Sequence, residues 1–395
     1  MTRQKALVAG VGMTAFATPG KSRPYTELVG EAVREAMTDA GIAYSDIQQA
    51  FVGYVYGDST SGQRALYEVG LTGLPIINVN NNCSSGSSAL FLARQAIESG
   101  AADCVLALGF EQMARGALTE HYADRPSPLD RFIEVAERRH GSTDTPMALR
   151  LFGGAARDYA KTYGTKPETF AQITVKARRH AAQNSKAVFR DPLTVEEVLA
   201  SPMMFDPLTR LQCCPPTCGA AAALLVSSAY AKRKNLQADV AVAAQALTTD
   251  TPASFEGDLT VVVGRDMSAA AARAVYETAG IGPEDIQVVE LHDCFTSNEV
   301  ISYEALGLAP AGGAEKLISD ADNTYGGRFV INPSGGLLSK GHPLGATGLA
   351  QCYELVNQLR GRAGTRQVDG AKIALQHNIG LGGACVVTLY EQVSR

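Results

Sequence analysis

The chain has 395 residues and a net charge of −5, with 46% hydrophobic and 19% charged residues. Together with 39 glycines and no tryptophan, this composition is typical of a well-buried α/β enzyme and excludes a disordered or fibrous protein. The charge does not indicate nucleic-acid binding, and no apolar run approaches the roughly 18 residues of a membrane span. The length predicts two or three domains.

Strand-like runs alternate with helical segments through the first 114 residues. Strands are expected at 6–9, 49–54, 76–79 and 104–108, and helices at 26–39 and 87–99. This alternation predicts a mainly parallel sheet covered by helices.

The next segment differs in character, because it holds 14 of the 35 lysines and arginines and several helical patterns. We interpret it as an inserted lid. Strand-like sequence returns at 220–227, 240–248, 372–376 and 384–390. The predicted organisation is an N-terminal half (1–114 plus 201–250), an inserted lid (115–200) and a C-terminal half (251–395).

Two internal matches predict that the halves are duplicates. Residues 37–48 recur at 276–287, with Ala-Gly-Ile and Asp-Ile-Gln at the same spacing and an offset of 239. The segment Asn-Cys-Ser-Ser-Gly at 82–86 matches Gly-His-Pro-Leu-Gly at 341–345 with an offset of 259. Because both matches occur in the same order, duplication explains them better than chance. The second match aligns a thiol with an imidazole.

These two reactive side chains, Cys83 and His342, each precede a helical segment. Free backbone N–H groups at a helix start favour negative charge, so the pKa of a thiol there is expected to be lowered. An imidazole brought alongside would supply a base. This pairing predicts an enzyme that works through an acylated cysteine.

Further candidates lie in the second half. His292 and Cys294 belong to a His-Asp-Cys-Phe run that ends a predicted strand, where catalytic groups of α/β sheets gather. The Gly-rich segment 378–383 would let the backbone approach a ligand closely. His377 precedes that segment, and both a structural and a functional role remain open.

The basic residues of the lid, especially Arg178, Arg179 and Lys186, have two interpretations. They form either a solvated helix face or a site for the phosphates of an anionic ligand, which arginine binds well. The cluster at 213–218 holds three cysteines but lacks a second Cys or His pair at zinc spacing, so no metal site is predicted.

The remaining cysteines show no disulfide-framework spacing, and neither end of the sequence reads as a targeting signal. A reducing compartment, the cytoplasm, is therefore expected.

Together with Cys83, Cys294 and His342, several longer motifs resemble the thiolase superfamily, above all the sterol-carrier-protein-type thiolases. The motifs are I-I-N-V-N-N-N-C, H-D-C-F, N-T-Y-G-G, N-P-S-G-G-L-L-S-K-G-H-P-L-G-A-T-G and A-L-Q-H-N-I-G-L-G-G. The resemblance spans nearly the whole chain. It implies a duplicated five-layered αβαβα fold with an inserted loop domain over the coenzyme A site. It also implies a homodimer or tetramer.

The same resemblance suggests roles for individual residues. Cys83 resembles the acylated nucleophile, and His342 its activating base and oxyanion donor. His292 would stabilise an enolate oxygen, and Cys294 would be the second acid/base thiol. Asn378 and Gly380 occupy the loop that carries a catalytic Cys-x-Gly in commoner thiolases, and the backbone N–H of Gly380 is expected to help hold an oxyanion.

One position departs from the subtype, because Thr-Cys-Gly stands at 217–219 where Ser-Asp-Gly is frequent. The implied reaction is thiolytic cleavage of 3-oxoacyl-CoA to acetyl-CoA or propionyl-CoA and a shortened acyl-CoA. Such a reaction belongs to fatty-acid β-oxidation or sterol side-chain breakdown. Coenzyme A would be a co-substrate, with no bound cofactor or metal. The alternatives are a condensing ketosynthase, a non-catalytic acyl-CoA- or sterol-binding relative, and a metal-dependent hydrolase.

Overall fold

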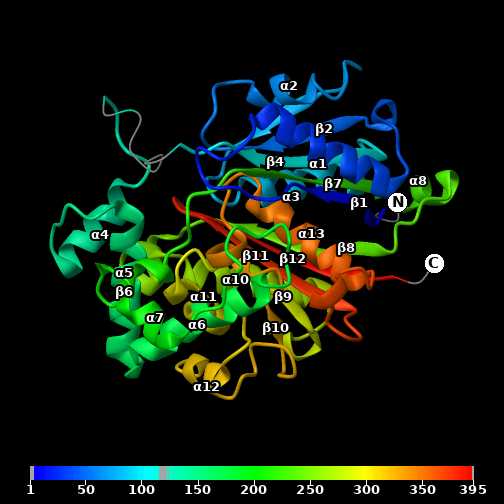
Figure 1. Ribbon diagram of the computed structural model, residues 1–395. Coiled ribbons are helices and arrows are strands. Elements are labelled where there is room, and N and C mark those ends of the chain that lie inside the picture. Colours follow the sequence, from blue (N-terminus) through cyan, green and yellow to red (C-terminus); the bar gives the residue numbers. More distant parts are fainter. Residues whose placement is uncertain (1–3, 115–121, 123, 394–395) are drawn as a thin grey trace.

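A computed structural model describes residues 4–114, 122 and 124–393. Two halves of the chain repeat the same pattern of strands and lie one above the other (Figure 1). The first half contains β1 (Ala6–Met13), α1 (Tyr25–Ala40), β2 (Gln49–Gly53), α2 (Ser61–Leu66), β3 (Ile76–Val79), α3 (Ser85–Glu98), β4 (Cys104–Glu111), β7 (Gly219–Ser227) and α8 (Ser228–Lys234). Its strands run in the order β3-β2-β4-β7-β1.

The second half repeats this order as β10-β9-β11-β12-β8. It contains β8 (Val240–Thr248), α9 (Leu259–Val262), α10 (Arg265–Ala279), β9 (Val288–Glu290), α11 (Thr296–Ala305), α12 (Ala314–Ser319), β10 (Val330–Ile331), α13 (Thr347–Leu359), β11 (Ile373–Gly380) and β12 (Ala384–Gln392). β1 and β8 pair through two residues each and join the halves into one ten-stranded sheet. The duplicated α/β fold expected from the sequence is confirmed.

Two details differ from the expectations. The sheet is mixed rather than mainly parallel, because four of its nine strand pairings are parallel and five antiparallel. In addition, β8 was placed in the N-terminal half, yet it pairs along its length with β12 and opens the second copy of the pattern. We propose that the C-terminal half begins at β8.

The offset of 239 holds through the repeated helix-turn-strand unit. α1 and α10 both stop at a left-handed glycine, Gly41 (φ 66°) and Gly280 (φ 70°), and 280 − 41 = 239. Left-handed backbone favours glycine, which explains why both copies keep it. The strands β2 and β9 then begin at residues 49 and 288, again 239 apart.

α3 and α13 lie between the two parts of the sheet, with α1 and α10 on the outer faces (Figure 1). The starts of the inner helices touch. A Cβ on Gly86 would lie 2.5 Å from the Gly345 oxygen, and one on Gly348 would lie 2.1 Å from Ser87 Oγ. Any larger side chain would push the helix starts apart, so these glycines bring the residues before the two helices together.

The expected lid holds α4 (Asp130–His140), α5 (Met147–Tyr163), α6 (Pro167–Ala181) and α7 (Val195–Ala200), followed by the hairpin β5 (Met203–Phe205) and β6 (Leu208–Thr209). α4 lies at the left edge of the molecule in Figure 1. Residues 115–121 and 123 of the lid lie outside the described part. The apolar core of the lid is continuous with that of the second half, and the Phe152 ring stacks on Phe295 at 4.9 Å between centroids. Among the described helices, none combines the length and apolarity needed to cross a membrane.

Candidate active site

Cys83 lies in a tight turn two residues before α3. Its neighbour Asn82 has a left-handed backbone (φ 50°), a conformation that is uncommon outside glycine and costs free energy. The Asn82 amide donates to the Leu381 carbonyl oxygen at 2.9 Å, which ties this turn of the first half to the β11–β12 turn of the second. The strained turn therefore holds the thiol at the junction of the halves.

His342 precedes the first turn of the other inner helix. Thr347 N donates to the Pro343 oxygen and Ser88 N to the Ser84 oxygen, so both helices open with equivalent bonds 259 residues apart. The Thr347 hydroxyl donates to the Pro343 oxygen at 2.9 Å, so its oxygen accepts from His342 Nδ1 at 2.7 Å. This network assigns the proton to Nδ1 and leaves Nε2 bare, with no hydrogen-bond partner among the described residues, as a base requires.

His292 is held in the opposite tautomer. Gln376 Nε2 donates to Ser87 Oγ at 2.8 Å, and the Ser87 hydroxyl donates to Asn378 Oδ1 at 2.7 Å. The Asn378 amide nitrogen must then donate to His292 Nδ1, at 2.9 Å. The proton of neutral His292 therefore sits on Nε2, which makes that nitrogen a hydrogen-bond donor. Asn378 acts through His292 and does not line the cavity.

The His-Asp-Cys segment directly follows β9, and its residues alternate in direction. His292 and Cys294 line the cavity, whereas Asp293 accepts backbone N–H bonds from Leu337 at 2.7 Å and from Leu338 at 3.4 Å. A tight turn at His292, closed by a hydrogen bond from Asp293 N to the Leu291 oxygen at 3.2 Å, sends these side chains to different sides. Asp293 thereby anchors the segment that leads to His342.

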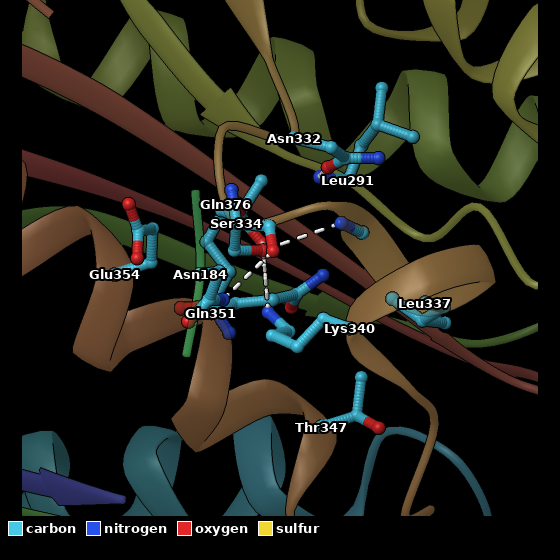
Figure 2. Close-up of polar contacts among 12 residues, drawn as sticks. Asn184, Leu291, Asn332, Ser334, Leu337, Lys340, Thr347, Gln351, Glu354 and Gln376 are labelled. Carbon is cyan, nitrogen blue, oxygen red and sulfur yellow. Dashed lines mark hydrogen bonds and ion pairs between the residues drawn. The ribbon is translucent and has the colours of Figure 1, made fainter. Parts of the chain in front are cut away.

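A buried polar network supports the same segment (Figure 2). Lys340 Nζ donates to Ser334 Oγ at 2.8 Å and lies 3.1 Å from a carboxylate oxygen of Glu290 at the end of β9. Asn184 Nδ2 donates to the Ser334 carbonyl oxygen at 2.9 Å. Because the lysine and the glutamate are both almost fully buried, removing either partner would leave an unpaired buried charge.

The Cys83 sulfur and one ring nitrogen each from His292 and His342 lie within 4.8 Å of one another. The two rings meet edge to face with centroids 5.1 Å apart. A thiolate and two imidazoles also form a ligand set for zinc, but a metal ligand must present a bare nitrogen and His292 presents an N–H. The arrangement suits a nucleophile, a base and an oxyanion donor.

These groups open into a cavity of about 940 Å³. Cys294 lines it with an exposed fraction of 4%. Lid residues 125–129, 146–148 and 152 also line it, and the remaining lining is mostly apolar. A cavity of this size with few convergent polar groups is typical of a small-molecule site.

The expected lowering of the Cys83 pKa is wrong. Burial raises it to about 12, helped by the negative charge of Glu111, although the backbone N–H groups of Leu381 and Cys83 oppose the rise. Burial lowers the pKa of His342 to about 3 and that of His292 well below its usual range. Desolvation outweighs the helix start, so the free protein holds a neutral thiol beside a neutral imidazole.

This charge state has a measurable consequence. Alkylation of Cys83 by iodoacetamide in the free protein is expected to be slower at pH 7 than that of an exposed thiol. Its rate should keep rising with pH past 9, because the thiolate forms only as the pH approaches a pKa of about 12. Peptide mapping of the alkylated protein across pH 6–10 checks this. A plateau below pH 8 would show that a lowered pKa is correct after all.

The structure does not bring all expected residues to the cavity. Gly380 ends β11 against Asn81, and the backbone amide facing the Cys83 sulfur is that of Leu381. His377 is buried and pairs with Ser268 at 2.9 Å through Nε2, which agrees with the structural interpretation.

The basic lid residues are also elsewhere. Arg178 is buried, with its guanidinium over an aromatic ring. Arg179 donates to Thr324 at 2.9 Å, and Lys186 pairs with Glu35 at 3.1 Å. None of the three lines the cavity: Arg178 and Arg179 lie on α6, which packs into the second half instead of covering the site, and Lys186 follows that helix. Their assignment to phosphates is therefore corrected.

Sequence reasoning missed several residues of the site. Cys214 was assigned to packing, yet it lines the cavity and its backbone N–H donates to the Cys294 oxygen at 2.8 Å. Tyr56 also lines the cavity, and Glu111 lies behind it. In the sequence, the signal that could have found Glu111 is a single carboxylate at the end of an otherwise apolar strand. All eight cysteines are free thiols.

Two protein-family models match this chain. The model of the thiolase N-terminal domain matches residues 6–229, and that of the thiolase C-terminal-like domain matches 248–390. Sterol carrier protein 2 from Bos taurus is 56% identical over 393 residues, which cover 98% of this chain and 72% of that protein.

Two solved structures share the fold. The Ltp2-ChsH2(DUF35) aldolase has a TM-score of 0.83 at 24% identity, with 98% of each chain covered. Human mitochondrial 3-ketoacyl-CoA thiolase in complex with CoA has a TM-score of 0.75 at 18% identity, covering 99% of this chain and 98% of that one. At these identities the likeness shows the fold alone.

Proposed function

Because this chain belongs to the thiolase family, we propose that it cleaves 3-oxoacyl-CoA with coenzyme A, releasing acetyl-CoA or propionyl-CoA and a shortened acyl-CoA. The observation that carries the proposal is the pair of opposite tautomers beside Cys83, a bare nitrogen on His342 and an N–H on His292. The first accepts a proton and the second donates to an oxyanion. Cys294 in the same cavity provides the second proton carrier.

The reaction begins when the Cys83 sulfur attacks the 3-oxo carbon and its proton passes to His342 Nε2. The new carbon–sulfur bond places negative charge on the former carbonyl oxygen. Backbone N–H groups of Cys83 and Leu381, which face the sulfur, are the available donors for that oxyanion. Concerted proton transfer lets a neutral thiol react without first forming a buried thiolate.

Collapse of this intermediate breaks the bond between carbons 2 and 3 and leaves an acyl-Cys83 and a CoA enolate. The enolate oxygen accepts from His292 Nε2–H and from His342, which now carries the proton taken from Cys83. Cys294 protonates the enolate carbon, and acetyl-CoA departs. Coenzyme A then gives its thiol proton to the Cys294 thiolate and attacks the acyl group, which returns Cys83 with its proton from His342.

For the phosphates of coenzyme A we propose lid residues nearer the cavity. Arg125 lines the cavity itself, and Arg131 lines an adjoining hollow of about 510 Å³ that shares Ser127 and Pro128 with it. Guanidinium groups bind phosphate through paired N–H donors. Coenzyme A is a co-substrate here, and no metal or resident cofactor takes part in the proposed steps. We further propose a homodimeric or tetrameric assembly in the cytoplasm and a role in fatty-acid or sterol side-chain breakdown.

Incubation with acetoacetyl-CoA and coenzyme A tests the proposal. Acetyl-CoA should form, and mass spectrometry of protein quenched without coenzyme A should show an acetyl group on the Cys83 peptide, because acylation precedes the second thiol. An adduct only on another cysteine would overturn the mechanism. Binding of acyl-CoA without turnover would instead favour a non-catalytic protein, and condensation with a carrier-protein substrate a ketosynthase.

A further inference from the structure

Glu111 is a fully buried carboxylate at the end of β4 that no step above uses. It accepts three hydrogen bonds, all from backbone N–H groups: Val55 at 3.1 Å, Tyr56 at 2.9 Å and Gly345 at 3.1 Å. The first two donors belong to the cavity wall after β2, and the third belongs to the turn after His342. One side chain thus joins the wall of the cavity to the turn that carries the base.

Tight packing around the Gly345 turn leaves its N–H dependent on Glu111 as an acceptor. A Cβ on Gly345 would lie 2.4 Å from the Phe110 oxygen and 2.6 Å from the Gly53 oxygen, and one on Gly109 would lie 2.1 Å from the Gly345 oxygen. The turn therefore packs in backbone contact against the paired ends of β2 and β4, where water does not reach its N–H. A buried donor without an acceptor costs about 1–3 kcal/mol, and Glu111 removes that penalty.

Burial at this position disfavours the ionised form of the carboxylate. Burial raises the pKa of Glu111 to about 7, although its three hydrogen bonds pull the value down. The titratable side chains that face it are Tyr56, Cys83 and Cys218, and its charge raises the pKa of each. Because the folded-state pKa lies above the ordinary value of 4.5, the unfolded chain ionises first, and stability is lost as the pH rises from about 4.5 to about 7. The Glu111 carboxylate lowers the stability of the fold and lies beside a reactive thiol. Its presence there points to a functional role.

We infer that Glu111 is a positioning residue: its ionised carboxylate holds the Gly345 turn, and with it His342, against the wall of the Cys83 cavity. Protonation turns one of its acceptor oxygens into a donor that faces backbone donors, which releases the turn. The inference rests on the proposed thiolysis for its catalytic readout and on the reactivity of Cys83 for an independent one.

The test compares Glu111→Gln with the parent protein in two assays. Turnover of acetoacetyl-CoA at pH 8 should fall about 10- to 100-fold, the loss expected when hydrogen bonds to a charged acceptor are removed. Alkylation of Cys83 by iodoacetamide should instead become faster at the same pH, because the charge that raises the pKa of the thiol is gone. Slower turnover with a more reactive thiol is not expected from general destabilisation.

The pH profile gives a third readout. Parent activity should decline as the pH falls below about 7, because Glu111 gains a proton, and Glu111→Gln should lack that component. A decline in activity at low pH that persists in Glu111→Gln belongs to other groups, such as Asp293, whose pKa burial raises to about 8. Glu111→Asp, which keeps the charge, should retain the component and recover part of the rate. If Glu111→Gln does not fold, Glu111→Asp tests the inference instead.

Glu354→Gln is the matched control, because Glu354 is equally buried but pairs with Arg366 away from the cavity. It should alter thermal stability without changing the alkylation rate or the shape of the pH profile. Parent-like turnover, profile and alkylation in Glu111→Gln would overturn the inference. If the parent itself fails to cleave acetoacetyl-CoA, the proposed function falls while the alkylation comparison still tests Glu111.

Discussion

Replacing Cys83 with alanine is expected to reduce thiolysis by about 10⁴-fold or more, the scale seen when a covalent nucleophile is removed. The substitution removes the atom that carries the acyl group, and neither imidazole can take its place. Binding of coenzyme A should survive, because the apolar lining of the cavity is unchanged. The measurement is steady-state turnover of acetoacetyl-CoA together with calorimetric titration of coenzyme A.

Cys352→Ala is the control for this change, because Cys352 is fully buried on α13 and lies in the apolar core. It should lower the melting temperature and leave turnover close to that of the parent. A Cys83→Ala protein that still forms acetyl-CoA at a rate near that of the parent would show that the chemistry uses another nucleophile, of which Cys214 and Cys294 are the candidates in the cavity.

Replacing Cys294 with alanine is expected to slow thiolysis by about 10²–10⁴-fold, the usual contribution of a general acid–base group. Both protonation of the enolate carbon and deprotonation of coenzyme A lose their proton carrier. Acetylation of Cys83 by acetyl-CoA should be spared more than turnover is. Burst kinetics with single-turnover mass spectrometry separate the two effects.

Cys385→Ala is the comparison that gives this experiment its meaning. Cys385 follows the Gly-rich turn, the region that carries the second thiol in commoner thiolases, but its sulfur lies in the core, 3.6 Å from Ser268 Oγ. Its replacement should change activity little. If the two variants behave the other way round, the β12 thiol carries the proton and the assignment of Cys294 is wrong.

Several features of the site follow from short stretches of sequence. The nucleophile and the base stand in motifs whose spacing repeats, and the helices after them open with equivalent hydrogen bonds. His292 and Cys294 could be predicted as candidates for one cavity, because the His-Asp-Cys run ends a predicted strand, where catalytic groups of α/β sheets gather. These inferences rely on geometry within a few residues, which neighbouring sequence controls.

Other features depend on distances between remote residues. Which nitrogen of His292 carries a proton is decided by a chain of side chains from Gln376 through Ser87 and Asn378, drawn from both halves. From the sequence, Arg178, Arg179 and Lys186 had two interpretations, a solvated face or a phosphate site, and only the packing of the lid shows that they lie away from the cavity. Sequence does not reveal which surface of an amphipathic helix is covered by a distant segment.

Local sequence patterns were sufficient for the duplicated α/β fold, for the 239-residue repeat with its glycine helix stops, and for proposing Cys83, His292, Cys294 and His342 as site residues. Their charge states, the donor at Leu381 and the bridge that Glu111 makes between the halves depend on contacts between distant segments. The physical reason is that backbone patterns are local, whereas desolvation and proton placement arise from everything within a few ångströms in space. For the pKa of Cys83 the local expectation and the tertiary structure disagree, because burial outweighs the effect of the helix start.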